Sequence, residues 1–101
     1  MQVRVKDEIY QIHFVDPSNA NLWLDGYRAL GVSDHKTKDI YIDRTLDEYD
    51  QETTLAHELF HCLFQESGIE NNYLFHNEDS VNFLGLNARD IAKMFKDVGI
   101  M

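Results

Sequence analysis

The sequence contains little of what marks a disulfide-bonded, fibrous or membrane-spanning protein. Among its 101 residues it has one cysteine, Cys62, one proline and five glycines. A single cysteine cannot form an internal disulfide, which favours a reducing compartment. So little proline and glycine excludes fibrous and low-complexity architectures. No run approaches the roughly 18 apolar residues of a membrane span, and no signal-peptide block opens the chain. We therefore expect a cytoplasmic protein with no membrane partner.

Basic residues are scarce as well. The sequence has 9 Lys and Arg against 18 Asp and Glu, which gives a net charge of −9. A surface this acidic repels phosphate backbones, so we expect no nucleic-acid partner. Hydrophobic residues make up 44% of the chain and aromatic residues 12%, which suffices for one packed core. We expect residues 1–101 to form a single domain.

Apolar and polar residues alternate in the first half of the chain, as they do in half-buried strands. This pattern predicts a hairpin over residues 2–15 and further strands over residues 27–33 and 39–43. Residues 19–25 predict a helical turn around residues 22–24, with Trp23 in the core beside Leu22 and Leu24. The last of these strands is short and flanked by charge, which suits the edge of a sheet.

From Leu46 onward the apolar residues recur at spacings of three and four, which predicts a helix. Asp47 and Asp50 are both candidate N-caps, because a carboxylate can accept a hydrogen bond from the free N–H groups of the first turn. Gly68 is the expected stop, because glycine readily adopts the left-handed conformation that follows many helices.

A second helical pattern follows residues 69–76, which we expect to form a loop. Asn77 or Asp79 should cap this pattern, and Gly85 and Asn87 should kink it or split it in two. Strands in the N-terminal half and helices in the C-terminal half together predict an α+β fold, with a small sheet packed on the helices.

Residues 57–61 read His-Glu-Leu-Phe-His, an H-E-x-x-H pattern inside the first predicted helix. Histidines at i and i+4 lie on one helical face, so His57 and His61 can hold the same metal ion. We expect one Zn²⁺ per chain, because zinc accepts imidazole and carboxylate ligands and keeps a position open for water. Glu58 can reach that water and act as general base in peptide hydrolysis. The purely structural alternative is two histidines that stack by coincidence.

A catalytic zinc site needs a third protein ligand, and the candidates lie where the second helix begins. From the ligand preferences of zinc we favour Glu78, then His76, then Asp79. The structural alternative for Glu78 is a carboxylate that stabilises a helix N-terminus. Asn82, one turn later, could orient a ligand imidazole through its other ring nitrogen. Tyr73 and His76 could donate a hydrogen bond to the tetrahedral oxyanion.

These motifs carry a resemblance to a known group of enzymes. The H-E-x-x-H helix, followed by Glu-Asp-Ser-Val at residues 78–81, resembles the gluzincin-type zinc metallopeptidases. Together with Asp39–Asp43 and with Thr-Thr-Leu-Ala-His-Glu-Leu at residues 53–59, it looks like the short peptidases of phages and prophages related to the ImmA/IrrE group. The resemblance covers about residues 27–98.

The resemblance implies that His57, His61 and Glu78 are the zinc ligands and that Glu58 is the general base. It also implies a zincin-like fold, in which a small mixed sheet of three or four strands has its edge strand along the cleft. For a phage-encoded chain, the expected compartment is the host cytoplasm.

Two functions compete at this point. One is a zinc metallopeptidase acting on a peptide or protein substrate. The other is a non-catalytic, zinc-stabilised interaction module whose acidic surface binds a basic protein or mimics DNA. Glu58 favours the enzyme, because a structural zinc site needs no base and is usually closed by four ligands rich in cysteine.

For the substrate of such an enzyme, we expect an extended peptide to pair with the strand at residues 39–43 as one more strand. Ile40 and Ile42 should then point to the core, and Tyr41 should face the other way.

Overall fold

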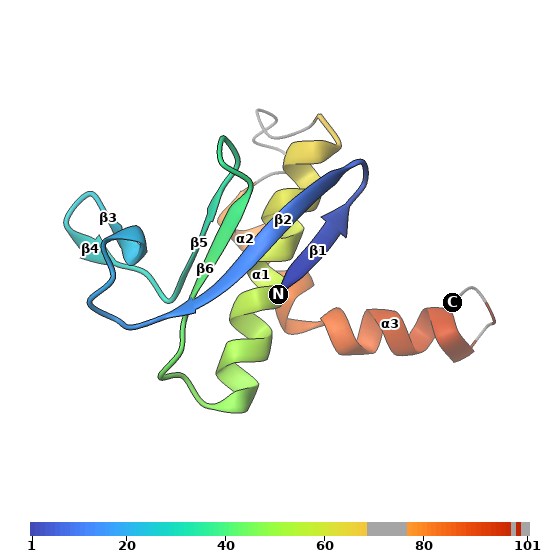
Figure 1. The fold of residues 1–101 in the computed structure, drawn as a ribbon. Coiled ribbons are helices and arrows are strands. Elements are labelled where there is room, and N and C mark those ends of the chain that lie inside the picture. The colour runs from blue at the N-terminus through green and yellow to red at the C-terminus, as the bar shows by residue number, and fades with distance from the viewer. Residues whose placement is uncertain (69–76, 98, 100–101) are drawn as a thin grey trace.

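The computed structural model describes residues 1–68, 77–97 and 99. Within these residues the strands come first and the longer helices follow, which confirms the predicted α+β class (Figure 1). The elements are β1 (Gln2–Val5), β2 (Glu8–Val15), the short 3₁₀ helix η1 (Ala20–Leu22), β3 (Trp23–Leu24), β4 (Tyr27–Arg28), β5 (Gly31–Asp34), β6 (Asp39–Asp43), α1 (Glu48–Glu66), α2 (Glu78–Leu86) and α3 (Ala88–Asp97). None of the described helices is long and apolar enough to cross a membrane.

Four of the described strands form one sheet in the order β1-β2-β6-β5. β1 and β2 are an antiparallel hairpin, β2 and β6 run parallel, and β6 and β5 are again antiparallel. The small mixed sheet is therefore confirmed. β5, and not β6, is the edge strand on the side opposite β1.

The interior position of β6 makes the expectation of an edge strand at residues 39–43 wrong. Ile40 and Ile42 do point to the core, where both are fully buried. The flanking aspartates that suggested an exposed edge have partners instead. His13 donates to the Asp39 carboxylate at 2.7 Å, and Arg28 donates to the Asp43 carboxylate at 3.1 Å. The charged residues at the two ends of β6 thus form ion pairs with β2 and β4, and they do not protect an exposed edge.

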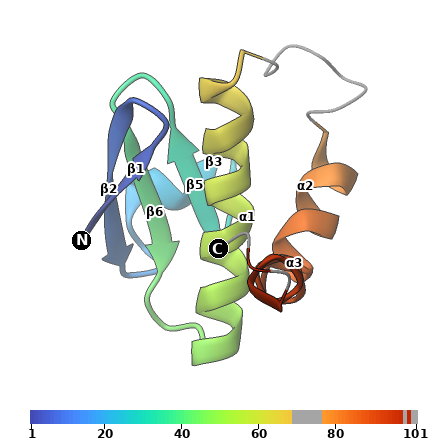
Figure 2. The ribbon, with the colours of Figure 1, turned by 90° about the vertical axis from the view of Figure 1, so that its right-hand side faces the viewer.

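The core lies between the sheet and α1, and α1 is the middle layer of the molecule. Figure 2 shows the sheet on one side of α1 and α2 on the other. The core side chains come from three strands and from α1: Val5, Tyr10, Ile12, Ile40, Ile42 and Cys62, with Leu55 and Leu59 packed against them. The helix that carries the H-E-x-x-H motif is therefore held from both sides.

The ends of the helices follow the predicted capping signals. The Asp47 side chain accepts a hydrogen bond from the Asp50 N–H at 2.7 Å and begins α1, and Gly68 follows the helix with a φ of 79°. Asn77 caps α2 by accepting from the Ser80 N–H at 2.9 Å. The second helical pattern splits at Asn87, which separates α2 from α3. The loop predicted at residues 69–76 lies outside the described residues.

β3 and β4 form a separate two-stranded hairpin that projects beside β5 (Figure 1). Leu22 is fully buried where the hairpin joins the body, but Trp23 is 49% exposed. The expectation of a core tryptophan is therefore wrong. Trp23 pairs with Arg28 in the hairpin, and this pairing carries the indole out of the body.

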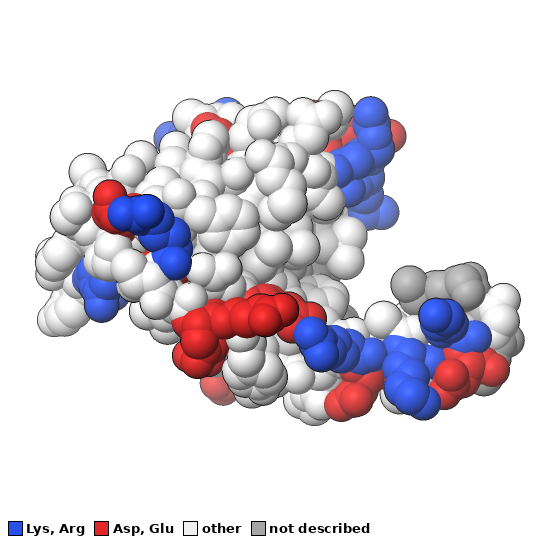
Figure 3. Space-filling model, turned by 60° about the horizontal axis from the view of Figure 1, so that its bottom comes forward, with Lys and Arg blue, Asp and Glu red and all other residues white. Residues whose placement is uncertain are grey.

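Charge is unevenly distributed over the surface. Viewed from below, acidic side chains gather on the body of the molecule, and basic and acidic side chains alternate along the projecting α3 (Figure 3). Glu48 and Asp50 lie in the first turn of α1, and Glu52 of the same helix forms an ion pair with Arg89 of α3. This ion pair fastens the first turn of α3 to α1.

Candidate metal centre and active site

α1 and α2 bring three potential metal ligands together. The Nε2 atoms of His57 and His61 are 3.1 Å apart, as expected for residues one turn apart on the same helical face. The Glu78 carboxylate, from the first residue of α2, lies 3.3 Å from His57 Nε2 and 3.0 Å from His61 Nε2. One ligand atom of each of the three residues lies within 4.8 Å of the others. Asp79 is exposed and outside this group, and His76 is outside the described residues.

The donor set fits a divalent metal ion such as Zn²⁺. Two imidazole nitrogens and one carboxylate are the protein ligands of many catalytic zinc sites. Glu78 is 70% exposed, yet both of its carboxylate oxygens face the histidines. So exposed a side chain could adopt other rotamers. A cation between its carboxylate and the two imidazoles would stabilise the observed one.

Gly85 allows α2 to approach α1 at the histidines. A Cβ built at this residue would lie 3.1 Å from the Cα and 3.2 Å from the backbone nitrogen of His57. Gly85 follows Glu78 by seven positions, which is about two helical turns and therefore the same face of α2. From the sequence, Gly85 and Asn87 predict a kink or a split of this helix, and the split occurs at Asn87. The close approach at Gly85, which the sequence does not reveal, sets the depth to which α2 packs and hence where Glu78 lies.

Glu58 is buried beside the cluster, with 6% of its surface exposed. The Ser33 hydroxyl, from β5, donates to Glu58 Oε1 at 2.9 Å, and Oε2 lies 4.0 Å from His57 Nε2. Burial raises the pKa of the Glu58 carboxyl above its usual range, while the hydrogen bond from Ser33 and the proximity of His57 act in the opposite direction. Sequence reasoning missed Ser33, because no local pattern joins a strand residue to a helix so distant along the chain.

These residues line a cleft of about 670 Å³ between β5, α1 and α2. Asn82 lies in its wall, as does His35, which sequence reasoning did not single out. Tyr73, the other predicted oxyanion donor besides His76, is outside the described residues. Residues 40–42 are not part of the wall, because β5 lies between β6 and the open side of the sheet.

The edge strand β5 turns polar backbone groups toward this open side. The Asp43 N–H donates to the Leu30 carbonyl at 2.9 Å, and the register continues with Val32 opposite Tyr41. Hydrogen-bonded and non-hydrogen-bonded pairs alternate along an antiparallel ladder. Gly31 and Ser33 therefore direct their backbone N–H and C=O groups away from β6. Both residues line the cleft.

Comparison with known proteins places the chain in a family. A family model described as the IrrE N-terminal-like domain, Peptidase M78, matches residues 7–92. This span runs from the turn before β2 into α3 and includes the motif helix and Glu78. A search of curated proteins and a search of solved structures find no match. The resemblance to the ImmA/IrrE group is thus confirmed, and the chain belongs to the family of IrrE N-terminal-like, metallopeptidase-type domains.

Proposed function

We propose that this protein is a zinc-dependent metallopeptidase that hydrolyses a peptide bond of a peptide or protein substrate. The observation that carries the proposal is the convergence of His57, His61 and Glu78 next to the buried carboxylate of Glu58, inside a cleft. Membership of a peptidase family supports it further. His57, His61 and Glu78 would hold one Zn²⁺ per chain, and Glu58 would be the general base.

The side chains around the cluster have separate tasks in this reaction. When bound, the metal polarises the substrate carbonyl and lowers the pKa of water at the site. Glu58 takes the proton of the attacking water and passes it to the leaving amine. The Ser33 hydroxyl holds Oε1 of Glu58, so that Oε2 is the oxygen that exchanges the proton. Burial of Glu58 excludes bulk water from this exchange.

The substrate would lie along β5 as an added strand. Gly31 and Ser33 offer backbone groups at the open edge, and the same strand contacts the helix that carries Glu58. The interior position of β6 excludes residues 40–42 from this role.

Metal content is the first test. We expect about one zinc per chain by inductively coupled plasma mass spectrometry, and a lower melting temperature in the presence of a chelator, because the metal binds only the folded site. His57→Ala and His61→Ala should each abolish stoichiometric zinc, and Glu78→Ala should weaken it strongly. Asp79→Ala is the matched control and should leave zinc content unchanged. Full occupancy in the double histidine variant would contradict the site.

Turnover is tested separately with Glu58→Gln. Zinc-loaded wild-type protein and this variant are incubated with a peptide digest of denatured casein, and new termini are identified by mass spectrometry. We expect cleavage by the wild type only, with equal zinc content in both proteins. Retained zinc with no cleavage by the wild type would favour the non-catalytic interaction module.

A further inference from the structure

The β3–β4 hairpin and the residues that join it to β5 expose four large apolar side chains that the proposed chemistry does not use. We call Trp23, Leu24, Tyr27 and Leu30 the hairpin surface. Their exposed fractions are 49%, 52%, 80% and 47%. Residues 20–33 carry one acidic and one basic side chain, in a sequence in which charged residues make up 27%. Leu24 and Tyr27 are paired across the hairpin and share one face, whereas Trp23 points to the other face. Large apolar side chains exposed so close together on a charge-rich protein mark an interaction site.

The turn of the hairpin is built from residues that favour its geometry. Asp25 and Gly26 both have positive φ, at 51° and 84°, which is the conformation of a type I′ turn. Below the turn, the Ala29 N–H donates to the Leu22 carbonyl at 2.7 Å, and the Leu22 side chain is fully buried. The hairpin therefore has a defined conformation, and the exposure of its apolar side chains follows from it.

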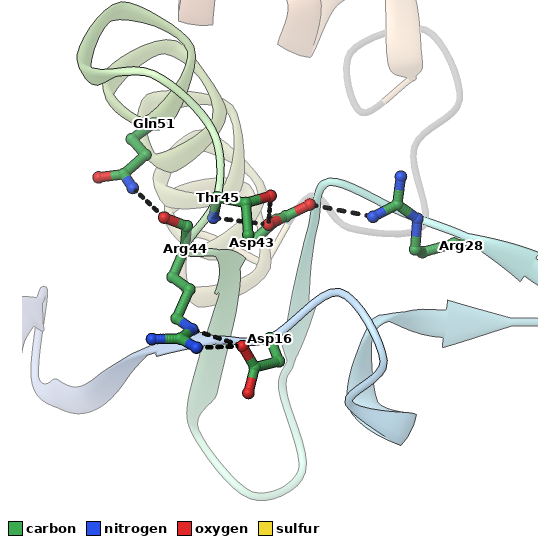
Figure 4. A network of polar contacts seen from close by, with 6 residues as sticks. All are labelled: Asp16, Arg28, Asp43, Arg44, Thr45 and Gln51. Carbon is green, nitrogen blue, oxygen red and sulfur yellow. Dashed lines mark hydrogen bonds and ion pairs between the residues drawn. The ribbon is translucent and has the colours of Figure 1, made fainter.

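A buried carboxylate fastens the hairpin to the body (Figure 4). Arg28 donates to Oδ2 of Asp43 at 3.1 Å, and Asp43 is 1% exposed. Oδ1 of Asp43 accepts from the Thr45 hydroxyl at 2.6 Å and from the Thr45 N–H at 2.8 Å. The guanidinium thus anchors β4 to the end of β6, which restrains the hairpin from swinging away from the cleft.

The hairpin surface continues into the cleft. Leu24 and Leu30 are part of the cleft wall, and Leu86 of α2, which is 65% exposed, lines the same cleft. Leu30 directly precedes Gly31, the first residue of the open edge. A peptide paired with β5 that continues beyond Gly31 would therefore pass between the hairpin and α2.

We propose that the hairpin surface, with Leu86, binds large apolar side chains of an extended segment of the polypeptide substrate. This inference rests on the proposed function and adds the class of sequence that the cleft accepts. Pairing with the open edge fixes the path of the peptide, and successive side chains of an added strand point to opposite faces. The four side chains of the hairpin surface are uncharged and offer no ionic partner, whereas apolar side chains gain by removing both surfaces from water.

Trp23 gives this proposal a direct assay. It is the only tryptophan of the sequence, so the intrinsic fluorescence of the protein reports on the hairpin. Two blocked peptides of equal length are titrated into zinc-loaded Glu58→Gln protein and into metal-free protein. One peptide has Leu and Phe at alternate positions, and the other has Ser and Asn there. We expect the apolar peptide to shift the Trp23 emission to shorter wavelength and to bind at least about tenfold more tightly.

Variants locate the binding surface. Tyr27→Ser and Leu24→Ser should each weaken binding of the apolar peptide by about tenfold, because removal of an aromatic or aliphatic anchor typically costs that much affinity. Neither variant should change zinc content or melting temperature. Tyr49→Ser is the matched control, because Tyr49 is a 63% exposed tyrosine that lies on α1 and not on the hairpin. This control should bind the peptide as the parent protein does.

Three results would overturn the proposal. The first is equal affinity for both peptides, and the second is equal loss in the Tyr49 variant. The third is a dimer in sedimentation velocity that Tyr27→Ser dissociates, which would make a second copy of the chain the occupant. Binding without turnover separates the two proposals. A protein that lacks zinc or cleavage but retains Trp23-reported binding would refute the peptidase while leaving the apolar surface in place.

Discussion

Replacing Gly85 by alanine should loosen the metal site from a position that touches no ligand atom. The new Cβ would lie between 3.1 and 3.3 Å from the Cα, N and Cβ atoms of His57, closer than carbon atoms pack without strain. Because the contacted atoms belong mainly to the backbone of α1, no side-chain rotation can relieve the contact. α2 would have to move outward by a few tenths of an ångström, and Glu78 would move with it.

Two opposing effects set the size of the change in stability. Alanine in place of glycine favours a helix by about 1 kcal/mol, and less near the end of α2, where Gly85 lies. Overpacking of one methyl group typically costs about 1–3 kcal/mol. The difference predicts a loss of roughly 0–2 kcal/mol in the free energy of unfolding of the metal-free protein. For a domain of this size, 1 kcal/mol corresponds to about 4–8 °C in melting temperature.

The effect on zinc should be larger than the effect on stability. Displaced supporting residues typically lower metal affinity about 10- to 100-fold, and we expect the lower end, because only one of the three ligands moves. The measurements are thermal unfolding of the metal-free protein and a zinc titration against a competing chelating dye. Phe83→Ala on the same helix, at a 64% exposed side chain, is the control. A Gly85→Ala protein with a higher melting temperature and unchanged zinc affinity would refute the close approach of α2 to His57.

Other expectations follow from buried contacts. A Cβ at Gly31 would lie 2.7 Å from Thr54 Cγ2, so Gly31→Ala should lower the urea midpoint of unfolding. Thr54→Ser removes that methyl group and, combined with Gly31→Ala, should recover much of the lost stability. Simple addition of the two single-variant effects would contradict the contact. Burial raises the pKa of the Cys62 thiol to about 12, so the native protein should not react with a disulfide reagent at about pH 8, whereas the unfolded chain should release one thiol equivalent. Hydrogen bonds from Thr45 hold the pKa of Asp43 below its usual range. The ionised carboxylate therefore stabilises the folded protein above the ordinary pKa of aspartate, and this stabilisation is lost as the pH falls through the lowered pKa. Asp43→Asn should flatten the fall of the unfolding free energy between about pH 5 and pH 2, and an unchanged acid limb would contradict this.

The parts of the fold that depend on nearby residues could be predicted from the sequence. Asp47 and Gly68 mark the two ends of α1, because capping and the left-handed stop are decided within a turn. The motif spacing put His57 and His61 on one face for the same reason. Glu78 could be ranked first from ligand chemistry, and the structure brings its carboxylate to both histidines.

The parts that depend on distant pairing could not be predicted. The parallel pairing of β2 with β6 joins strands separated by the hairpin and β5, and no local pattern in Asp39–Asp43 encodes that neighbour. Charge at the ends of a short strand is typical of an edge, so the local sequence points to the wrong neighbours. Trp23 lies between two leucines, which favours a core position. The Asp-Gly dipeptide at residues 25–26 is nevertheless a strong signal for a type I′ hairpin, and it could have placed the indole on a projecting element.

The central position of α1 between the sheet and α2 joins catalysis to the global folding of the chain. The histidines sit in the middle of a helix that is packed on both faces, and a core helix of this kind opens only with global unfolding. Hydrogen exchange of their backbone amides in the metal-free protein should therefore require the same opening as global unfolding, and bound metal should slow it by the full binding free energy. Mutations that weaken the core would then release the metal, even where they lie far from any ligand. Natural selection on activity and natural selection on stability would act on the same helix.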